Sequence, residues 1–280
     1  MRTEQEMMGL ILGVAAADER VRAVVMNGSR ADPNAPRDIF QDYDIVYYVT
    51  DIDSYAEDRS WVDIFGERMI MQMPKSDCCL VYLMQFTDGN RIDLTLVPLF
   101  EKQEFSTKDK LAVALMDKDN VLPPLPPPTD EDYWVRPPSR QDYDECCNEF
   151  WWVAVYVAKG LCRREILYAK WHLDRIVREM LLQMLEWEAS IATDFLVSMG
   201  KCRKRLEAHL PEEQWQALLL TYADGSYEGT WNSLFAACDL FRQTAKFVAS
   251  HFGYEYPGGD DQRVSKHLER LRDLCASSGV

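Results

Sequence analysis

Residues 21–50 decide the fold of this chain and read VRAVVMNGSRADPNAPRDIFQDYDIVYYVT. Two runs rich in β-branched and aromatic residues, 21–27 and 43–50, are each typical of a strand. Gly28 and Ser29 end the first run, so we expect a strand, a tight glycine turn and then a helix. Backbone N–H groups in such a turn can approach a phosphate closely, and the following helix offers its positive end.

Three acidic residues accompany these strands. Asp42 and Asp44 lie two apart at the start of the second run, so both carboxylates point to one face of the strand. In a later run, 91–99 (RIDLTLVPL), Asp93 shares a face with Arg91. If the two strands are neighbours, three carboxylates converge, and like charges raise one another's pKa unless a cation lies among them. Mg²⁺ takes hard oxygen ligands and substrate phosphates, so the pattern predicts a phosphoryl-transfer site.

Each of these signals is weak alone. A Gly-Ser pair is most often an ordinary turn, and an Asp-x-Asp is most often a solvated strand end. Their order and spacing on three strand ends favour a site over coincidence.

The rest of the N-terminal half predicts an α+β domain with a mixed sheet of about five strands. Apolar residues at helical spacing predict an amphipathic helix over 4–18. Further strands are expected over 68–73 and 81–87, and the turn Asp88-Gly89 predicts a hairpin to the next strand.

The C-terminal half predicts an α-helical domain. The segment VLPPLPPPT (121–129) holds five prolines in nine residues and is typical of a stiff polyproline-type connector. We therefore expect an N-terminal domain over 1–135, with the connector at 121–138, and a helical substrate-binding domain over 139–280. The helices are predicted over 141–159, 165–188, 190–209, 212–223, 230–252 and 261–274.

Composition narrows the classes of function. The 280 residues include 31 Lys and Arg against 46 Asp and Glu, a net charge of −15, which argues against a nucleic-acid partner. Hydrophobic residues make up 47% of the chain, enough for a real core and too many for a disordered protein. The acidity favours cationic partners, although it is also common on soluble proteins.

The compartment is predicted to be the cytoplasm. Glu4 and Glu6 stand where a signal peptide would carry positive charge, and no apolar run is long enough to span a membrane. The eight cysteines form no Cys-x-x-Cys motif, so we expect reduced thiols.

The Gly-Ser turn, the Asp-Tyr-Asp motif and the later Arg-Ile-Asp resemble the nucleotidyltransferase superfamily, whose fold is the palm of DNA polymerase beta. Longer segments are similar to one family within it, the aminoglycoside 6-adenylyltransferases, also called streptomycin adenylyltransferases. These segments include AVVMNGSRADPN, YLMQFTDGNRIDLTLVPL and CCNEFWWVAVYVAKGLCRREILYAK. The resemblance extends from Met1 to about Arg270. One departure is a shorter stretch between Met73 and Tyr82.

This resemblance implies transfer of AMP from ATP to the 6-hydroxyl of streptomycin, with release of pyrophosphate and resistance to the antibiotic. Asp42 and Asp44 match the magnesium ligands of the family. Asp93 matches the third carboxylate, which is a metal ligand, the general base for the attacking hydroxyl, or both.

The resemblance also assigns the residues that bind nucleotide. Gly28 and Ser29 match the triphosphate cradle. Apart from the resemblance, Arg30 beside this turn offers a positive charge to the nucleotide. Lys170, preferred over Lys159, matches a lysine expected to neutralise the β- and γ-phosphates.

The acceptor is expected to contact the helical domain. Glu145, Glu149, Trp151 and Asp174 are candidate ligands of the drug, because carboxylates and aromatic planes both bind guanidinium. For Trp151 and its neighbour Trp152, each taken singly, a place in the core is the favoured interpretation.

Two alternatives stay open. One is the same chemistry on another aminoglycoside or a lincosamide, and the other is a catalytically silent ATP-binding relative. We expect a monomer in which ATP and the acceptor meet between the two domains.

Overall fold

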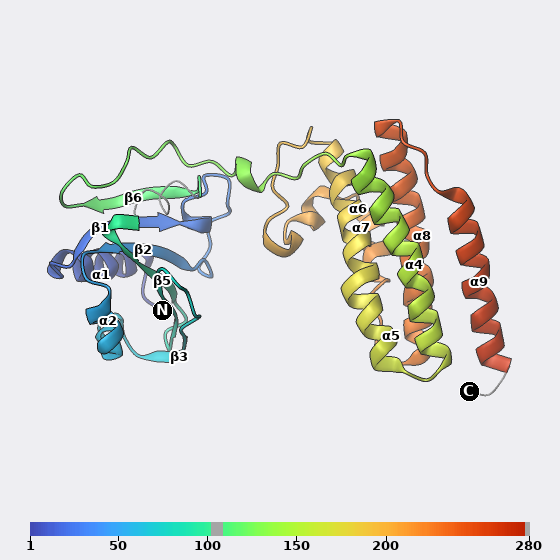
Figure 1. Ribbon diagram of the computed structural model, residues 1–280, viewed down its shortest axis with the longest axis horizontal. Helices are drawn as coiled ribbons and strands as arrows, with labels where there is room; N and C mark the ends of the chain where they lie inside the picture. Colours follow the sequence, from blue (N-terminus) through green and yellow to red (C-terminus); the bar gives the residue numbers. More distant parts are fainter. Residues whose placement is uncertain (102–108, 278–280) are drawn as a thin grey trace. The chain divides into compact units, whose positions relative to one another are not determined.

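The chain folds into two compact units, Met1–Asp132 and Tyr133–Val280 (Figure 1). The computed structural model describes residues 1–101 and 109–277. Unit 1 combines a mixed sheet with helices and unit 2 is helical, so the predicted α+β class is confirmed.

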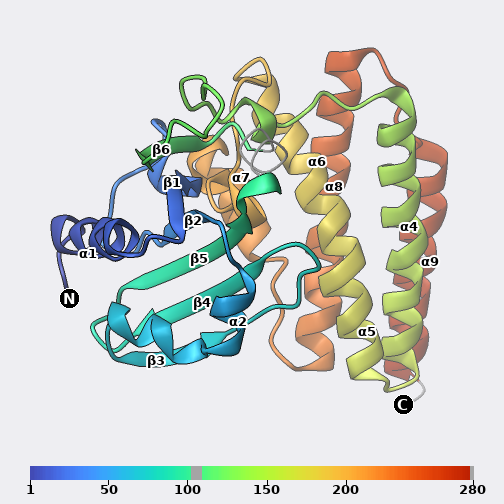
Figure 2. The same cartoon turned by 60° about the vertical axis from the view of Figure 1, so that its left-hand side comes forward.

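Unit 1 is built on a six-stranded sheet with the order β3-β4-β5-β2-β1-β6. Figure 2 shows β3, β4 and β5 side by side. β2 and β5 run parallel, and every other pair of neighbours is antiparallel. The strands are β1 (Val21–Asn27), β2 (Tyr43–Val49), β3 (Arg68–Gln72), β4 (Leu80–Phe86), β5 (Arg91–Pro98) and β6 (Ala112–Asp117).

The prediction of about five strands missed β6. This edge strand reads AVALMD, which is rich in alanine and lacks the alternation of a half-buried strand. Antiparallel pairing with β1 stabilises this strand, and the local sequence of β6 does not predict that pairing.

One face of the sheet is covered by α1 (Glu4–Ala17), α2 (Asp53–Glu57) and a 3₁₀ helix, η2 (Arg59–Phe65). α1 begins at a capping box, in which Thr3 and Glu6 satisfy each other's backbone N–H groups. Tyr43 and Ile45 of β2 are buried in this layer. The alternation of side chains therefore turns Asp44 to the opposite face of the sheet.

The proline-rich segment covers that opposite face. Val121, Leu122 and Leu125 pack against a cluster that includes Val46 and Tyr48 of β2. The start of the predicted connector is therefore part of unit 1, and the chain passes to unit 2 only after Asp132.

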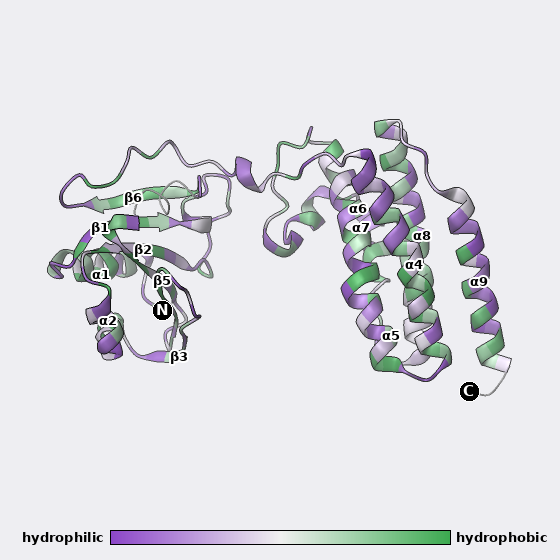
Figure 3. Cartoon of the chain, in the orientation of Figure 1, coloured by the Kyte–Doolittle hydropathy of each residue, from purple (hydrophilic) through white to green (hydrophobic). Residues whose placement is uncertain are grey.

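Unit 2 is a helical domain whose buried apolar side chains form one core, and Figure 3 shows hydrophobic and hydrophilic residues in turn along its helices. α5 and α6 are joined through one π-helical turn, Leu173–Val177. None of the helices in the described parts of the chain combines the length and apolarity that a membrane span needs. The helices are α4 (Arg140–Cys162), α5 (Ile166–His172), α6 (Arg178–Ile191), α7 (Glu212–Leu219), α8 (Tyr227–Phe252) and α9 (Gly258–Ser277).

The predicted helix over 190–209 is wrong. α6 ends at Ile191, and Asp194 and Phe195 adopt positive φ angles of 50° and 60°, which a right-handed helix does not allow. Two 3₁₀ turns follow, η6 (Lys201–Arg203) and η7 (Leu206–His209). The apolar residues of this stretch have helical spacing because separate short turns, and no continuous helix, bury them.

The expectation that all thiols are reduced is also wrong in this structure. Cys162 of α4 and Cys275 of α9 form a disulfide across 113 residues of sequence. Cys146, Cys147 and Cys238 are buried and carry free thiols. No local motif marks a pair so far apart, so the sequence offers no signal for it.

Candidate functional site

The predicted carboxylates meet at the ends of the central strands of unit 1. β2 and β5 are neighbours, and their parallel register places Asp44 beside Asp93. On the other side of β2, Asp44 is paired with Asn27, the last residue of β1. Asp42 directly precedes β2. The sheet therefore brings all three carboxylates to one end of three adjacent strands.

The glycine turn lies directly against this group. Gly28 has a φ of +70°, a conformation that L side chains rarely adopt. A Cβ atom at Gly28 would lie 2.2 Å from Oδ2 of Asp44. The expected helix after the turn is only a three-residue 3₁₀ helix, Gly28–Arg30, so the prediction of a helix dipole at this point is wrong. Ser29 lies within that short helix.

Arg91 is the cation among the carboxylates. Its Nε and Nη2 donate to the two oxygens of Asp93, each at 2.7 Å, and its Nη1 lies 3.4 Å from Oδ2 of Asp42. The hydrogen bonds to Asp93 raise the pKa of Arg91, and the nearby negative charges add to this shift. The sequence placed Arg91 and Asp93 on one face but did not indicate that Arg91 bridges two carboxylates.

Arg30 is committed to the loop that leads into β2. Its side chain is 5% exposed, and its guanidinium donates to the backbone carbonyls of Gln41 at 2.9 Å and Asp42 at 3.0 Å. The same group lies 3.8 Å from the centre of the Tyr43 ring and forms an ion pair with Glu4. These contacts give Arg30 a structural role, and its predicted contact with nucleotide stays a prediction.

The donor chemistry of the site suits a divalent cation. Among the residues that the structure describes, no group of three acidic, cysteine or histidine side chains is arranged to hold a metal ion. At this site, Arg91 forms ion pairs with both Asp42 and Asp93. Asn27 Oδ1 and Gln41 Oε1 are buried beside the turn without a hydrogen-bond partner, as at a site that receives a ligand. Hard carboxylate oxygens next to a glycine turn fit Mg²⁺ and phosphate, provided that Arg91 yields one carboxylate.

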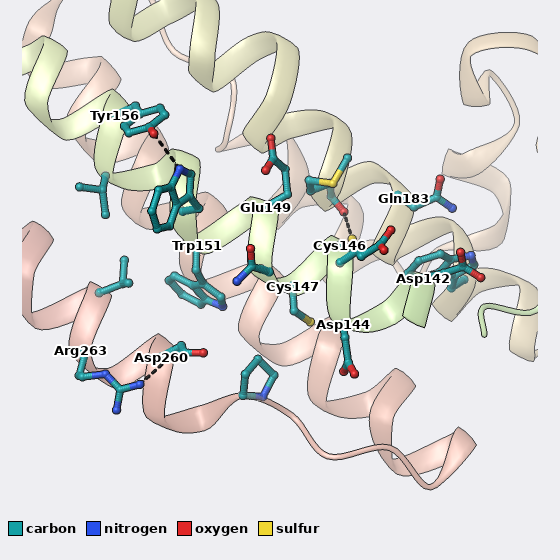
Figure 4. Close-up of a pocket in the computed structure, with 18 of the residues that line it drawn as sticks. Asp142, Asp144, Cys146, Cys147, Glu149, Trp151, Tyr156, Gln183, Asp260 and Arg263 are labelled. Carbon is teal, nitrogen blue, oxygen red and sulfur yellow. Dashed lines mark hydrogen bonds and ion pairs between the residues drawn. The ribbon is translucent and has the colours of Figure 1, made fainter. Parts of the chain in front are cut away.

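A large pocket lies within unit 2, lined by α4, α6 and α9 (Figure 4). Its volume is about 1300 Å³. Glu145, Glu149, Trp152 and Tyr156 recur at steps of four, three and four residues, so they share one face of α4. The lining is acidic and aromatic, with five carboxylates against two cations: Asp142, Asp144, Glu145, Glu149 and Asp260 against Lys159 and Arg263.

The predicted acceptor residues divide into three groups. Glu145 and Glu149 line this pocket and are exposed. Trp151 also borders it, but only 2% of the side chain is exposed, because its ring packs edge-on against core aromatic rings. The accessible ring is that of Trp152, which is 60% exposed and donates a hydrogen bond to Tyr156 at 2.7 Å. The helical spacing from Glu145 and Glu149 was the signal that favours Trp152.

The fourth predicted acceptor residue, Asp174, contacts Lys170, which is predicted to bind the nucleotide phosphates. Nζ of Lys170 lies 3.4 Å from Oδ2 of Asp174 and donates to the carbonyl of Ala223 at 3.2 Å. Asp174 also pairs with the buried Arg178. Asp174 does not belong to the lining of the pocket described above.

Comparison with known proteins gives consistent matches. Residues 1–271 match the family described as streptomycin adenylyltransferase. An aminoglycoside 6-adenylyltransferase of Bacillus subtilis (strain 168) is 42% identical, with 97% of this chain and 98% of that protein covered. One of Campylobacter jejuni is 44% identical, with 97% and 96% covered. The crystal structure of an aminoglycoside 6-adenyltransferase from Bacillus subtilis is similar with a TM-score of 0.50 and 38% identity, covering 97% of this chain and 99% of that one.

Proposed function

Because this chain belongs to the streptomycin adenylyltransferase family, we propose that it transfers AMP from ATP to the 6-hydroxyl of streptomycin and releases pyrophosphate. The observation that carries this proposal is the meeting of Asp44 and Asp93 on paired strands, with Gly28 packed against Asp44. The named relatives are aminoglycoside 6-adenylyltransferases, which supports an aminoglycoside as the acceptor.

The nucleotide is proposed to bind in unit 1. Gly28 and Ser29 would hold the triphosphate through backbone N–H groups and the serine hydroxyl. Asp42, Asp44 and Asp93 would hold Mg²⁺, which when bound offsets the negative charge that develops at phosphorus. Lys170 is proposed to add a positive charge to the β- and γ-phosphates.

Asp93 is proposed to take the proton of the attacking hydroxyl. A hydroxyl is a weak nucleophile near neutral pH, so a carboxylate in hydrogen-bond reach speeds the attack. In the transfer, the acceptor oxygen forms a bond to the α-phosphorus, the bond to the pyrophosphate oxygen breaks, and Asp93 keeps the proton. Each Asp93 oxygen accepts one hydrogen bond from Arg91 and retains a second lone pair for this role.

The acceptor is proposed to bind in the pocket of unit 2 that α4, α6 and α9 line, called here the α4 pocket. Streptomycin carries two guanidinium groups and an amine, which suit a pocket lined by more carboxylates than cations. Glu145 and Glu149 would pair with guanidinium groups, and the exposed ring of Trp152 offers a plane for stacking. The buried Trp151 supports that helix face from the core.

Pyrophosphate release from ATP and Mg²⁺, with streptomycin and a panel of other acceptors, tests the proposal. We expect release with streptomycin, reduced at least about 100-fold in Asp42→Asn and Asp44→Asn because charge stabilisation at the reacting phosphorus is lost. Asp53→Asn, an exposed carboxylate of the same unit, is the control and should keep wild-type turnover.

Each other outcome changes a defined part of the proposal. Release with a different acceptor would keep the reaction and replace streptomycin. Failure to bind ATP in the presence of Mg²⁺ would refute the reaction itself. A cytoplasmic location, where ATP is available, and a monomeric state also stay part of the proposal.

A further inference from the structure

Arg91 occupies the carboxylate oxygens that a divalent cation would need. We propose that Arg91 is an internal counter-ion of the site, which competes with the divalent cation for Asp42 and thereby keeps the affinity for metal alone low. This inference rests on the proposed function, because it concerns the same three carboxylates. It assigns to Arg91 a positioning role that acts through those carboxylates.

The contacts of Arg91 are unequal, and this inequality identifies the carboxylate that is released. Asp93 accepts two hydrogen bonds of 2.7 Å in the bidentate geometry that suits guanidinium best. The contact of Arg91 with Asp42 is longer, with Nη1 at 3.4 Å from Oδ2. Asp42 is therefore the carboxylate that passes to a cation, while Asp93 stays oriented by Arg91.

The side chain of Arg91 has the freedom that such an exchange needs. It is 35% exposed, whereas the side chain of Arg30 nearby is 5% exposed and fixed to backbone carbonyls. Arg91 can thus give up one carboxylate without opening the core, and Arg30 cannot. The two arginines of the site accordingly have different roles, one adjustable and one structural.

Unit 1 also contains a matched control. Arg22 donates to both oxygens of Asp119, at 2.6 and 2.7 Å, and its Nη1 lies 3.5 Å from Glu19. This is the same pattern of one bidentate and one distant carboxylate. Arg22 lies near the start of β1, whereas Asn27 at the site is the last residue of that strand.

Mn²⁺ binding to the full chain without nucleotide, followed by electron paramagnetic resonance, tests the inference. We expect Arg91→Ala to lower the Kd for Mn²⁺ about tenfold, the effect of removing one charged hydrogen-bonding competitor. Arg22→Ala should bind Mn²⁺ as the wild type does. Adding Asp42→Asn to Arg91→Ala should abolish the gain, which locates the ion at Asp42.

An unchanged or higher Kd in Arg91→Ala would overturn the inference and leave Arg91 a purely structural residue. Circular dichroism checks that Arg91→Ala folds. If it does not fold, Arg91→Gln, which has a similar length and no charge, replaces it, and the same decrease in Kd is expected. The proposed function is refuted separately, if the wild-type protein with ATP binds no Mn²⁺ and releases no pyrophosphate. If the wild type binds Mn²⁺ and releases pyrophosphate, but neither Arg91→Ala nor Arg91→Gln binds Mn²⁺ more tightly, only the counter-ion role is refuted.

Discussion

Comparing Gly28→Ala with Gly253→Ala should separate the effect of backbone strain from the effect of a collision at the candidate site. At Gly28 the added methyl group meets two penalties, a φ of +70° and a contact of 2.2 Å with Oδ2 of Asp44. Gly253, which caps α8, has a nearly identical φ of +69°, and a Cβ there meets nothing within 4 Å. Gly253→Ala therefore imposes the strain without the collision.

The magnitudes follow from these distances. An alanine in the left-handed region costs about 1 kcal/mol of stability at either position, which lowers the melting temperature by about 3 °C. At Gly28 the carboxylate of Asp44 must also retreat by about 1 Å to reach ordinary contact, and a displacement of that size at a reacting centre reduces turnover about 100-fold. Gly253→Ala should leave turnover unchanged.

Thermal unfolding by circular dichroism and pyrophosphate release with saturating ATP, Mg²⁺ and streptomycin give the two readouts. Both variants should lose similar stability, and only Gly28→Ala should lose activity. If Gly28→Ala retains turnover within twofold of the wild type, the contact between the turn and Asp44 does not matter for the chemistry, and the reasoning is refuted.

Three further predictions concern other parts of the chain. Trp152→Ala should raise the KM for the acceptor about tenfold without lowering the melting temperature, because the ring is exposed; an unchanged KM would remove Trp152 from the acceptor site. Burial alone would raise the pKa of Asp18, but hydrogen bonds led by Arg20 lower it from 3.8 to about 2, so stability present above pH 3.8 should be lost as the pH falls toward 2. The urea midpoint of Asp18→Asn should depend less on pH over that window than the wild-type midpoint. Reduction of the disulfide between Cys162 and Cys275 should lower the melting temperature of the wild type, whereas a reductant should have no effect on Cys275→Ser.

The sequence was sufficient for the parts of the site that depend on strand alternation. Asp42 and Asp44 are two residues apart before a run of buried aromatic and aliphatic residues, and this fixes their common face. The hypothesis that the strand of Asp93 is a neighbour was confirmed by the parallel pairing of β2 with β5.

The parts that failed depend on contacts between distant residues. β6 forms because it pairs with the otherwise unpaired edge of β1, and the disulfide joins cysteines 113 residues apart. The second contact of Arg91, with Asp42, arises only once β2 and β5 are paired. In unit 2, the choice between Trp151 and Trp152 as an acceptor residue depended on the exact rotation of α4, which one residue of helical phase changes by about 100°.

The parallel pairing of β2 and β5 has a consequence for folding kinetics. Asp44 and Asp93 are separated by 49 residues of sequence, and the segment between them contains α2, β3 and β4. Because the entropy of closing such a loop is lost before the pairing contributes stability, long-range parallel pairs form late. The backbone hydrogen bonds of the helices in unit 2 join residues only four apart in sequence. During refolding, the ability to bind nucleotide should therefore appear with the slow completion of the sheet, well after most of the helical signal has recovered.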